Sequence, residues 1–335
     1  MNINTAAVNI KSEGAFKLEV LDTEGNLVDK GLPDKIGNVV TYAGMYTLLT
    51  GSYSSGGLWG KFKHQIGTGT TELTRSSTGL GTLTNSTPDW ENNRARSTSY
   101  ETDNLDGTST IEISRTSSFA LGTVVGTFSE VGTAQPAGFV AGQLIKDEFG
   151  SPTTITILAD EQLRITYTLS LTVPAGSGNA VSIGTGTVTT QSSTSNYTVF
   201  GQPILADYLV GGSERNAIFS YTTGDLVFCN SLGNLVYFGS SVEGGQNLSL
   251  SHDGSGTVTL TMTLASFPPS SFNSTDIAYV IIGGDPNNSD PINTTSKLRN
   301  VDVNSGGYSV IEFSPVLEKS SSEAIEFAFS MTYTI

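Results

Sequence analysis

The sequence predicts an all-β fold, an antiparallel β-sandwich with one short N-terminal helix. In three stretches, at 163–173, 257–264 and 325–335, apolar residues alternate with mostly hydroxyl-bearing residues. Side chains on a strand point alternately to opposite faces, so each stretch has one apolar and one polar face. The polar face is mostly threonine, which favours strands. Antiparallel sheets with one solvated face show this alternation.

The N-terminal part is expected to form a hairpin followed by the helix. Residues 16–20 alternate as in a strand, and 22–26 (DTEGN) form a turn before the next short strand. The helix is predicted at 38–49, with Asn38 as its N-cap and Gly51 after its end. Its apolar residues keep the 3.6-residue spacing of an amphipathic helix.

The middle of the chain is expected to contain loops, a second hairpin and a domain boundary. Residues 51–60 and 76–107 are rich in glycine and polar residues and are interpreted as loops. Asp147 to Pro152 are predicted to form a turn, with strand from Thr153 onward. After Pro174 the sequence AGSGNA is typical of a linker. We therefore predict an N-terminal β domain at 1–176, with the helix and an attachment or assembly role, and a C-terminal β-sandwich domain at 177–335.

Turn residues divide the second half of the chain into eight expected strands. These lie at 200–205, 225–228, 235–238, 248–250, 257–264, 277–282, 308–313 and 325–335. The pentapeptide IGTGT occurs at 66–70 and again at 183–187, which is a weak indication of internal duplication.

The composition favours assembly and excludes several kinds of partner. Charged residues make up 14% of the 335 residues, and the net charge is −15. Few charges must be desolvated when such a surface is buried, so a homo-oligomer is expected. The negative charge disfavours nucleic acid and anionic membranes as partners. No apolar run is long enough for membrane insertion, and the first residues do not resemble a signal peptide, so folding in a cytoplasm is expected.

Few residues are suited to catalysis. The two histidines, His64 and His252, are interpreted as solvated polar residues, and Cys229 as a buried free thiol. The sequence has no nucleophile elbow and too few Cys and His residues for a zinc cluster. Gly67-Thr68-Gly69 is interpreted as a glycine-rich turn, because no helix pattern follows to complete a phosphate loop. We assign no catalytic residue, no cofactor and no metal, and we expect the chain not to be an enzyme.

Two acidic loops and three aromatic residues leave alternatives open. Oxygen-bearing side chains suited to calcium gather in two stretches: Asp103, Asn104 and Asp106, and Asp285, Asn287, Ser289 and Asp290. Ordinary turns use the same residues. Trp59, Trp90 and Tyr100 are expected in loops, where they would either contact a sugar or cover the edge of the core.

The segment at 117–173 carries a pattern that is more specific than composition. Its matching residues are Phe119, Gly122, Gly126, Glu130, Val131, Leu144, Ile145, Lys146, Asp147, Gly150, Pro152, Thr153, Thr154, Ile155, Thr156, Leu163 and Tyr167. This pattern resembles a family of bacteriophage virion proteins, the tail fibre and tail appendage proteins. The helix and the IGTGTTELTRSSTGL stretch within 36–80, and the segment at 308–335, are similar to other parts of that family.

The resemblance implies a non-enzymatic structural protein of the virion, located in the tail, collar or neck. Such a fibre, appendage or adaptor subunit would form a homo-oligomer, bind other virion proteins, and act in particle assembly and host attachment, with a host surface glycan as a further partner. Two alternatives remain: a carbohydrate-binding adhesive β-sandwich, and a polysaccharide-degrading enzyme on a β scaffold. The second would need a facing carboxylate pair, which the sequence does not single out.

Overall fold

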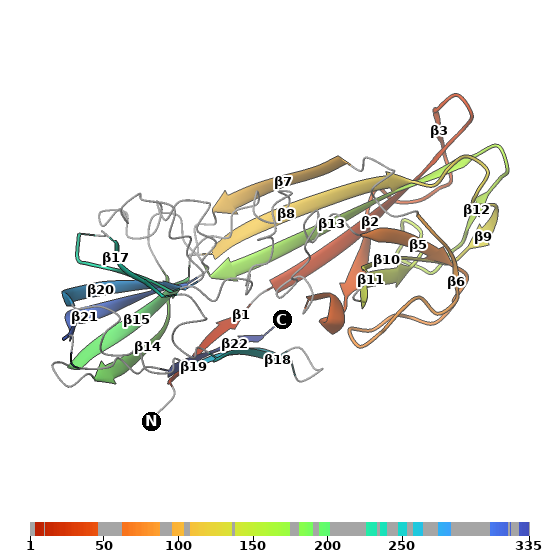
Figure 1. Cartoon of the computed structure of the whole chain (residues 1–335). Coiled ribbons are helices and arrows are strands. Elements are labelled where there is room, and N and C mark those ends of the chain that lie inside the picture. Colours follow the sequence, from red (N-terminus) through yellow and green to blue (C-terminus); the bar gives the residue numbers. More distant parts are fainter. Residues whose placement is uncertain are drawn as a thin grey trace.

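The computed structural model describes most of the first half of the chain and separate strands of the second half (Figure 1). The described residues are 4–9, 11–45, 62–87, 96–103, 108–135, 138–174, 181–189, 194–201, 226–232, 235–239, 247–252, 257–263, 274–282, 309–320, 322 and 328–334. Strands make up 59% of the described part and helix 3%, which confirms the all-β class with one short helix. No helix in these ranges is long and apolar enough to cross a membrane.

Most strands of the first half belong to one large antiparallel sheet. In chain order the strands are β1 (Asn4–Asn9), β2 (Lys11–Leu21), β3 (Leu27–Val28), β4 (Ile36–Val40), β5 (Lys63–Gly67), β6 (Leu83–Ser86), β7 (Arg96–Asp103), β8 (Thr108–Ser118), β9 (Gly126–Phe128), β10 (Glu130–Gln135), β11 (Gly138–Leu144), β12 (Ile155–Ile157) and β13 (Gln162–Pro174). Ten of them form this main sheet, in the order β6-β5-β10-β11-β4-β2-β13-β8-β7, with β3 paired to β2. The strands β9 and β12 pair separately with each other.

The main sheet curls because β4 changes its partner along its length. Its first three residues pair with β2, and its last two pair with β11. The two parts of the sheet therefore face each other across the core. The ring of Phe62, beside β5, lies 6.5 Å from that of Tyr167 on β13. The ring of Phe16 on β2 lies 5.0 Å from Tyr167, and all three side chains are buried.

The register predicted for residues 163–173 is confirmed over 163–172, where the burial of the side chains is described. Leu163, Ile165, Tyr167, Leu169 and Leu171 are at most 1% exposed, and the residues between them are half-buried. Because β13 pairs with β2 on one side and β8 on the other, one of its faces lies against the core and the other lies outside.

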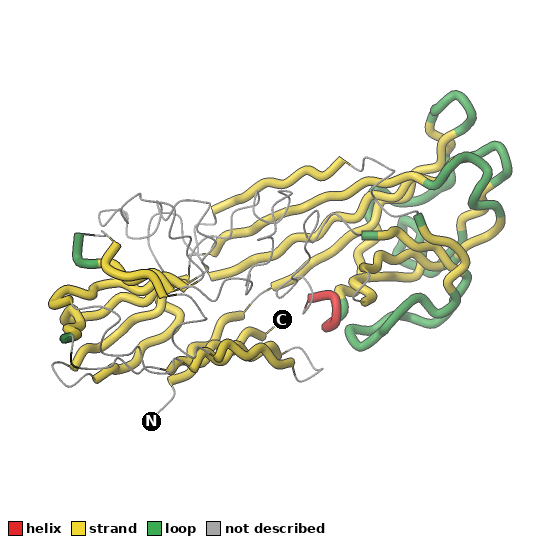
Figure 2. The backbone as a smooth tube through the Cα atoms, viewed as in Figure 1, coloured by secondary structure: helices red, strands yellow, loops and turns green. Residues whose placement is uncertain are grey.

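The predicted helix is present, but its predicted start is wrong. Asn38 lies in β4, and the described helical residues are 42–45, drawn in red in Figure 2. Thr41 caps the helix instead, since its Oγ1 accepts a hydrogen bond from the Gly44 N–H at 3.0 Å. The two valines that follow Asn38 pair with β11, so sheet pairing extends the strand up to the cap. Residues 46–49 lie outside the described part.

Nine further strands are described after residue 180, and seven of them match strands expected from the sequence. The strand at 194–201 shares only residues 200 and 201 with the one expected at 200–205, and the strand at 181–189 was not expected. In chain order they are β14 (Val181–Thr189), β15 (Thr194–Gly201), β16 (Leu226–Cys229), β17 (Leu235–Gly239), β18 (Asn247–His252), β19 (Thr257–Thr263), β20 (Ser274–Ile282), β21 (Ser309–Lys319) and β22 (Ala328–Thr334). Six form an antiparallel sheet in the order β14-β15-β21-β20-β16-β17.

The first described strand joins the last one. The remaining three strands and β1 form a sheet in the order β1-β22-β19-β18, in which β1 and β22 run parallel. In Figure 1 this sheet lies near β14 and β15, whereas β3, β9 and β12 lie at the opposite end of the main sheet. We call that opposite end the distal end. The division into domains at 1–176 and 177–335 stays a prediction, and residues 175–180 lie outside the described part.

Candidate functional surfaces

His64 is buried, so its interpretation as a solvated residue is wrong. It lies on β5 with no exposed surface, and its Nε2 is 3.3 Å from the backbone oxygen of Arg115. The same alternation that turns Phe62 and Ile66 into the core places His64 between them. A neutral ring with its proton on Nε2 would donate to that oxygen. Within the described ranges, no group of three His, Cys, Asp or Glu residues could hold a metal.

We expect His64 to make folding sensitive to acid. Burial, with the nearby Arg115 charge, lowers the pKa of His64 from 6.5 to about 3. Between these values the unfolded chain binds the proton and the folded chain does not, so stability is full above pH 6.5 and falls with pH. At about 1.4 kcal/mol per pH unit, His64 should cost roughly 2–3 kcal/mol of unfolding free energy between pH 7 and pH 4.5. Urea unfolding of the wild type and His64→Asn at both pH values measures this difference. An equal acid loss in both proteins would contradict it.

The interpretation of Cys229 is confirmed. Its side chain is 3% exposed on β16, and burial raises the pKa of the thiol to about 12. At neutral pH the group is therefore a protonated thiol, which is a poor nucleophile.

The other singled-out residues are placed in strands or fall outside the described part. Tyr100 and Asp103 lie on β7, which corrects the prediction that Tyr100 is in a loop, and His252 is the last residue of β18. The remaining candidates, Trp59, Trp90, Asn104, Asp106 and 285–290, lie outside the described residues.

The carboxylate of Glu130 holds both ends of the loop that joins β5 and β6. Its Oε1 accepts hydrogen bonds from the Gly69 N–H at 2.8 Å and the Thr82 N–H at 2.7 Å, and its Oε2 accepts one from the Gly81 N–H at 2.8 Å. Glu130 is fully buried. A methyl group on Gly69 would lie 2.6 Å from both carboxylate oxygens, so only glycine permits this approach. The predicted turn at 67–69 is thus the first part of a loop built around one carboxylate.

The rest of this loop is held against the sheet. Leu73 and Leu80 lie over Gly142 and Gly132, which are opposite each other in β11 and β10. At its tip, the Arg75 backbone oxygen accepts a hydrogen bond from the Tyr42 N–H at 2.9 Å, and the guanidinium lies 5.9 Å from the centre of the Tyr42 ring. Residues 68–82 therefore form a compact surface loop, the class of loop that often carries function.

Replacing Glu130 by Gln should destabilise the protein by about 2–3 kcal/mol, because one amide group then faces a backbone N–H and the charge-assisted hydrogen bonds are lost. Urea unfolding measures the change, and trypsin cleavage after Arg75 should become faster as the loop opens. Glu148→Gln, at an exposed carboxylate, is the matched control and should change stability by less than about 0.5 kcal/mol. Equal stability of Glu130→Gln and the wild type would show that the carboxylate does not hold the loop.

Two turns at 22–26 and 147–151 have the same hydrogen bonds. In each, the aspartate Oδ1 accepts from the N–H groups two and four residues later, at 2.8 Å for Asp22 and 2.9 Å for Asp147. The fourth residue, Gly25 or Gly150, has a positive φ of 85° or 79° that glycine adopts readily. The predicted turns are confirmed, although the strand after the second begins at Ile155 instead of Thr153.

The distal end exposes apolar side chains within an acidic surrounding. Four apolar residues are 49% to 54% exposed there: Leu83, Leu121, Val125 and Leu158. Two hydrogen bonds to backbone oxygens join the segments that carry them. Asn85 Nδ2 donates to the backbone oxygen of Thr123 at 3.0 Å, and the Gly122 N–H donates to the backbone oxygen of Glu161 at 3.3 Å. We call these four residues the distal apolar surface.

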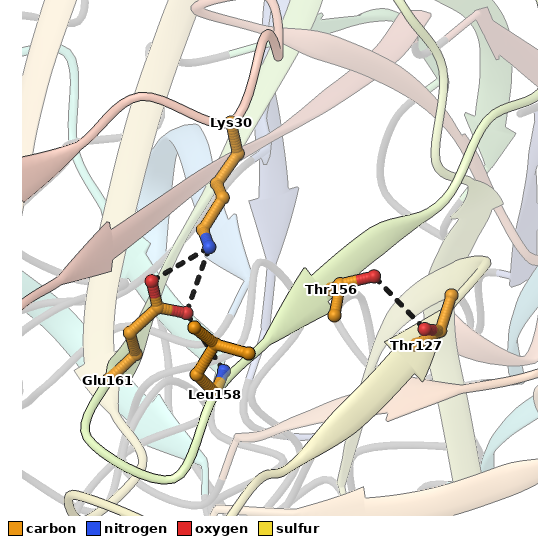
Figure 3. Close-up of polar contacts among 5 residues, drawn as sticks. All are labelled: Lys30, Thr127, Thr156, Leu158 and Glu161. Atoms are coloured by element: carbon orange, nitrogen blue, oxygen red, sulfur yellow. Dashed lines mark hydrogen bonds and ion pairs between the residues drawn. The ribbon is translucent and has the colours of Figure 1, made fainter.

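Charged residues border the distal apolar surface. Glu161 accepts a hydrogen bond from the Leu158 N–H at 2.8 Å and pairs with Lys30 at 2.8 Å, as Figure 3 shows. The segments at 22–35 and 146–161 together hold eight acidic and three basic residues. This end therefore carries a net charge of −5, which favours a partner of opposite charge over a second copy of itself.

Comparison with known proteins gives no relative from which a function could be transferred. No family model, curated protein or solved structure matches this chain. The resemblance to phage virion proteins therefore stays a prediction from the sequence.

Proposed function

We propose that this chain is a structural subunit of a bacteriophage particle, a fibre, appendage or adaptor of the tail, collar or neck. In this proposal it assembles as a homo-oligomer, binds other virion proteins and carries out no catalysis. Host attachment, with a surface glycan as the ligand, is a further role in the proposal.

One observation supports this proposal most strongly. Two of the segments that carry the resemblance to virion proteins, the IGTGTTELTRSSTGL stretch and the segment at 117–173, meet at Glu130. A residue of the second segment thus fixes the loop made by the first. Similarity that comes only from shared composition gives no reason for the matching residues to be in contact.

The surface chemistry also supports an assembly role. Hydrogen bonds join the segments that carry the distal apolar surface, and exposed apolar surface is typical of protein contacts. His64 and Cys229, two of the residues considered for catalysis, are both buried. Repetition of weak contacts around a symmetry axis would supply affinity without a deep binding site.

Particles of the phage that encodes the chain provide the test. On the proposal, the chain remains with particles purified through a density gradient and washed in high salt, at more than one copy per particle. The purified chain should release no sugar from the host polysaccharide. Absence from washed particles would refute the structural role, and release of sugar that is lost on mutating one Asp or Glu would favour the enzyme alternative.

A further inference from the structure

One outer face of the main sheet carries a ladder of hydroxyl groups along β8 and β13. Four cross-strand pairs of side-chain oxygens form it: Thr110–Thr172 at 2.9 Å, Glu112–Ser170 at 3.4 Å, Ser114–Thr168 at 2.7 Å and Thr116–Thr166 at 2.7 Å. In the register of β8 and β13 the two members of each pair lie opposite each other. Successive pairs are two residues apart along each strand. At ~3.4 Å per residue the ladder is about 20 Å long. We call the outward side chains of β2, β8 and β13 the hydroxyl face.

The hydroxyl face has no net charge, unlike the chain as a whole. Its charged residues are Lys11, Lys17 and Arg164 against Glu13, Glu19 and Glu112. Three ion pairs within the face, at 2.6, 3.2 and 2.9 Å, join five of these residues. The chain carries a net charge of −15, so two copies repel each other in general. They meet with the least repulsion where each presents a neutral surface.

The hydroxyl pairs are chemically self-complementary. Two hydroxyls carry two protons, and the hydrogen bond between them uses one. The Ser114–Thr168 and Thr116–Thr166 pairs therefore each retain a proton to donate, together with oxygen lone pairs that can accept. A second identical face offers the same groups in return, as an isologous contact requires. Threonine methyl groups add apolar contact area without any charge to desolvate.

The distal end does not offer this match to a second copy. Its segments carry a net charge of −5, so two distal ends would place like charges opposite each other. Of the two surfaces compared, only the hydroxyl face suits contact with itself.

We propose that the hydroxyl face is an interface between two copies of this chain, packed face to face about a two-fold axis. This inference rests on the homo-oligomer in the proposed function and names the surface that forms it. The half-buried side chains of the ladder become fully buried in that contact, and the distal end stays free for a different partner.

Analytical ultracentrifugation of the full-length chain tests the interface. The wild type should sediment as a multiple of 35.1 kDa, and Thr168→Glu should raise the dissociation constant at least about tenfold, because like charges then face each other. Thr156→Glu is the matched control. Thr156 is exposed on β12 and also has a cross-strand hydroxyl partner, Thr127 at 3.0 Å (Figure 3). The Thr156→Glu variant should associate with the same dissociation constant as the wild type.

The outcomes separate the two proposals. A wild type that is monomeric at all concentrations overturns the homo-oligomer of the proposed function, and with it this interface. An oligomeric wild type whose Thr168→Glu variant is folded and equally associated overturns only the interface.

If Thr168→Glu does not fold, Thr168→Cys replaces it. A bismaleimide reagent should cross-link Thr168→Cys into dimers and leave Thr156→Cys monomeric, because Cys229 is buried. Equal cross-linking of both variants would overturn the interface.

Discussion

Removing residues 325–335 should prevent the chain from folding into a soluble protein. This segment contains β22, which lies between β1 and β19 in its sheet. Seven residues of β22 pair with β19 and six with β1. Its loss leaves β1 without its described partner and exposes one edge of β19, which keeps β18 on its other side. Unpaired strand edges are templates for aggregation. The expected result is an insoluble or unfolded product, measured as the soluble fraction after expression and by circular dichroism.

A deletion of residues 1–9 is the control for this experiment. It removes β1, which is at the edge of the same sheet and pairs only with β22 in the described part. The loss of an edge strand should lower solubility less than the loss of the strand beside it. A chain without 325–335 that stays soluble, folded and bound to particles would contradict the role given to β22.

Replacing Leu169 by Ala should destabilise the protein by about 2–5 kcal/mol, the range for deleting a buried leucine side chain. Leu169 has no exposed surface and lies on the core side of β13, opposite Gly14 of β2 and Ile113 of β8. The size of the loss within that range depends on how far the neighbours can close the cavity. Urea unfolding gives the change in free energy.

Thr168→Ala is the matched control for Leu169→Ala. Thr168 is the next residue on the same strand but faces outward, with a hydroxyl partner in Ser114 at 2.7 Å. Losing that half-buried contact should cost no more than about 1 kcal/mol. A larger loss for Thr168→Ala than for Leu169→Ala would mean that the faces of the sheet are assigned the wrong way round.

Strands with one apolar and one hydroxyl face could be predicted from sequence alone. In β13 the apolar residues at alternate positions lie in the core, and the mostly threonine and serine residues between them lie on the outer face, as expected. The pattern is clear there because the strand lies between two neighbours and has only one solvated face.

Several strands were missed, among them three without this contrast. The residues of β6 (LTNS) and β7 (RSTSYETD) lie in the stretch 76–107 that the sequence indicates as a loop, and those of β14 (VSIGTGTVT) follow the predicted linker. All three are end strands in the strand order of their sheets. Polar residues and glycine can continue a strand when pairing with a neighbour fixes the backbone, and pairing leaves no local signal.

The pentapeptide IGTGT shows how context decides structure. At 66–70 it ends β5 and enters the loop held by Glu130, whereas at 183–187 it lies within β14 and pairs with β15. The deciding residue at the first site, Glu130, is 61 positions away from Gly69. The three N–H partners of its carboxylate belong to this distant loop, so no local pattern around Glu130 could indicate the contact.

The helix start was wrong for a related reason. Asn38 has the chemistry of an N-cap, and sequence spacing placed the helix directly after it. The pairing of β4 with two different strands determines where the extended backbone ends, and this places the cap at Thr41.

A cryo-electron microscopy map of the intact phage particle, with this chain traced in it, is the decisive experiment for the structural role. We expect symmetry-related copies in the tail, collar or neck, built from the curled main sheet and the sheet that joins β1 to β22. The hydroxyl faces of two copies should be in contact there, and the distal end should meet another protein or point toward the host. A particle map in which every tail, collar and neck density belongs to other chains would contradict the account.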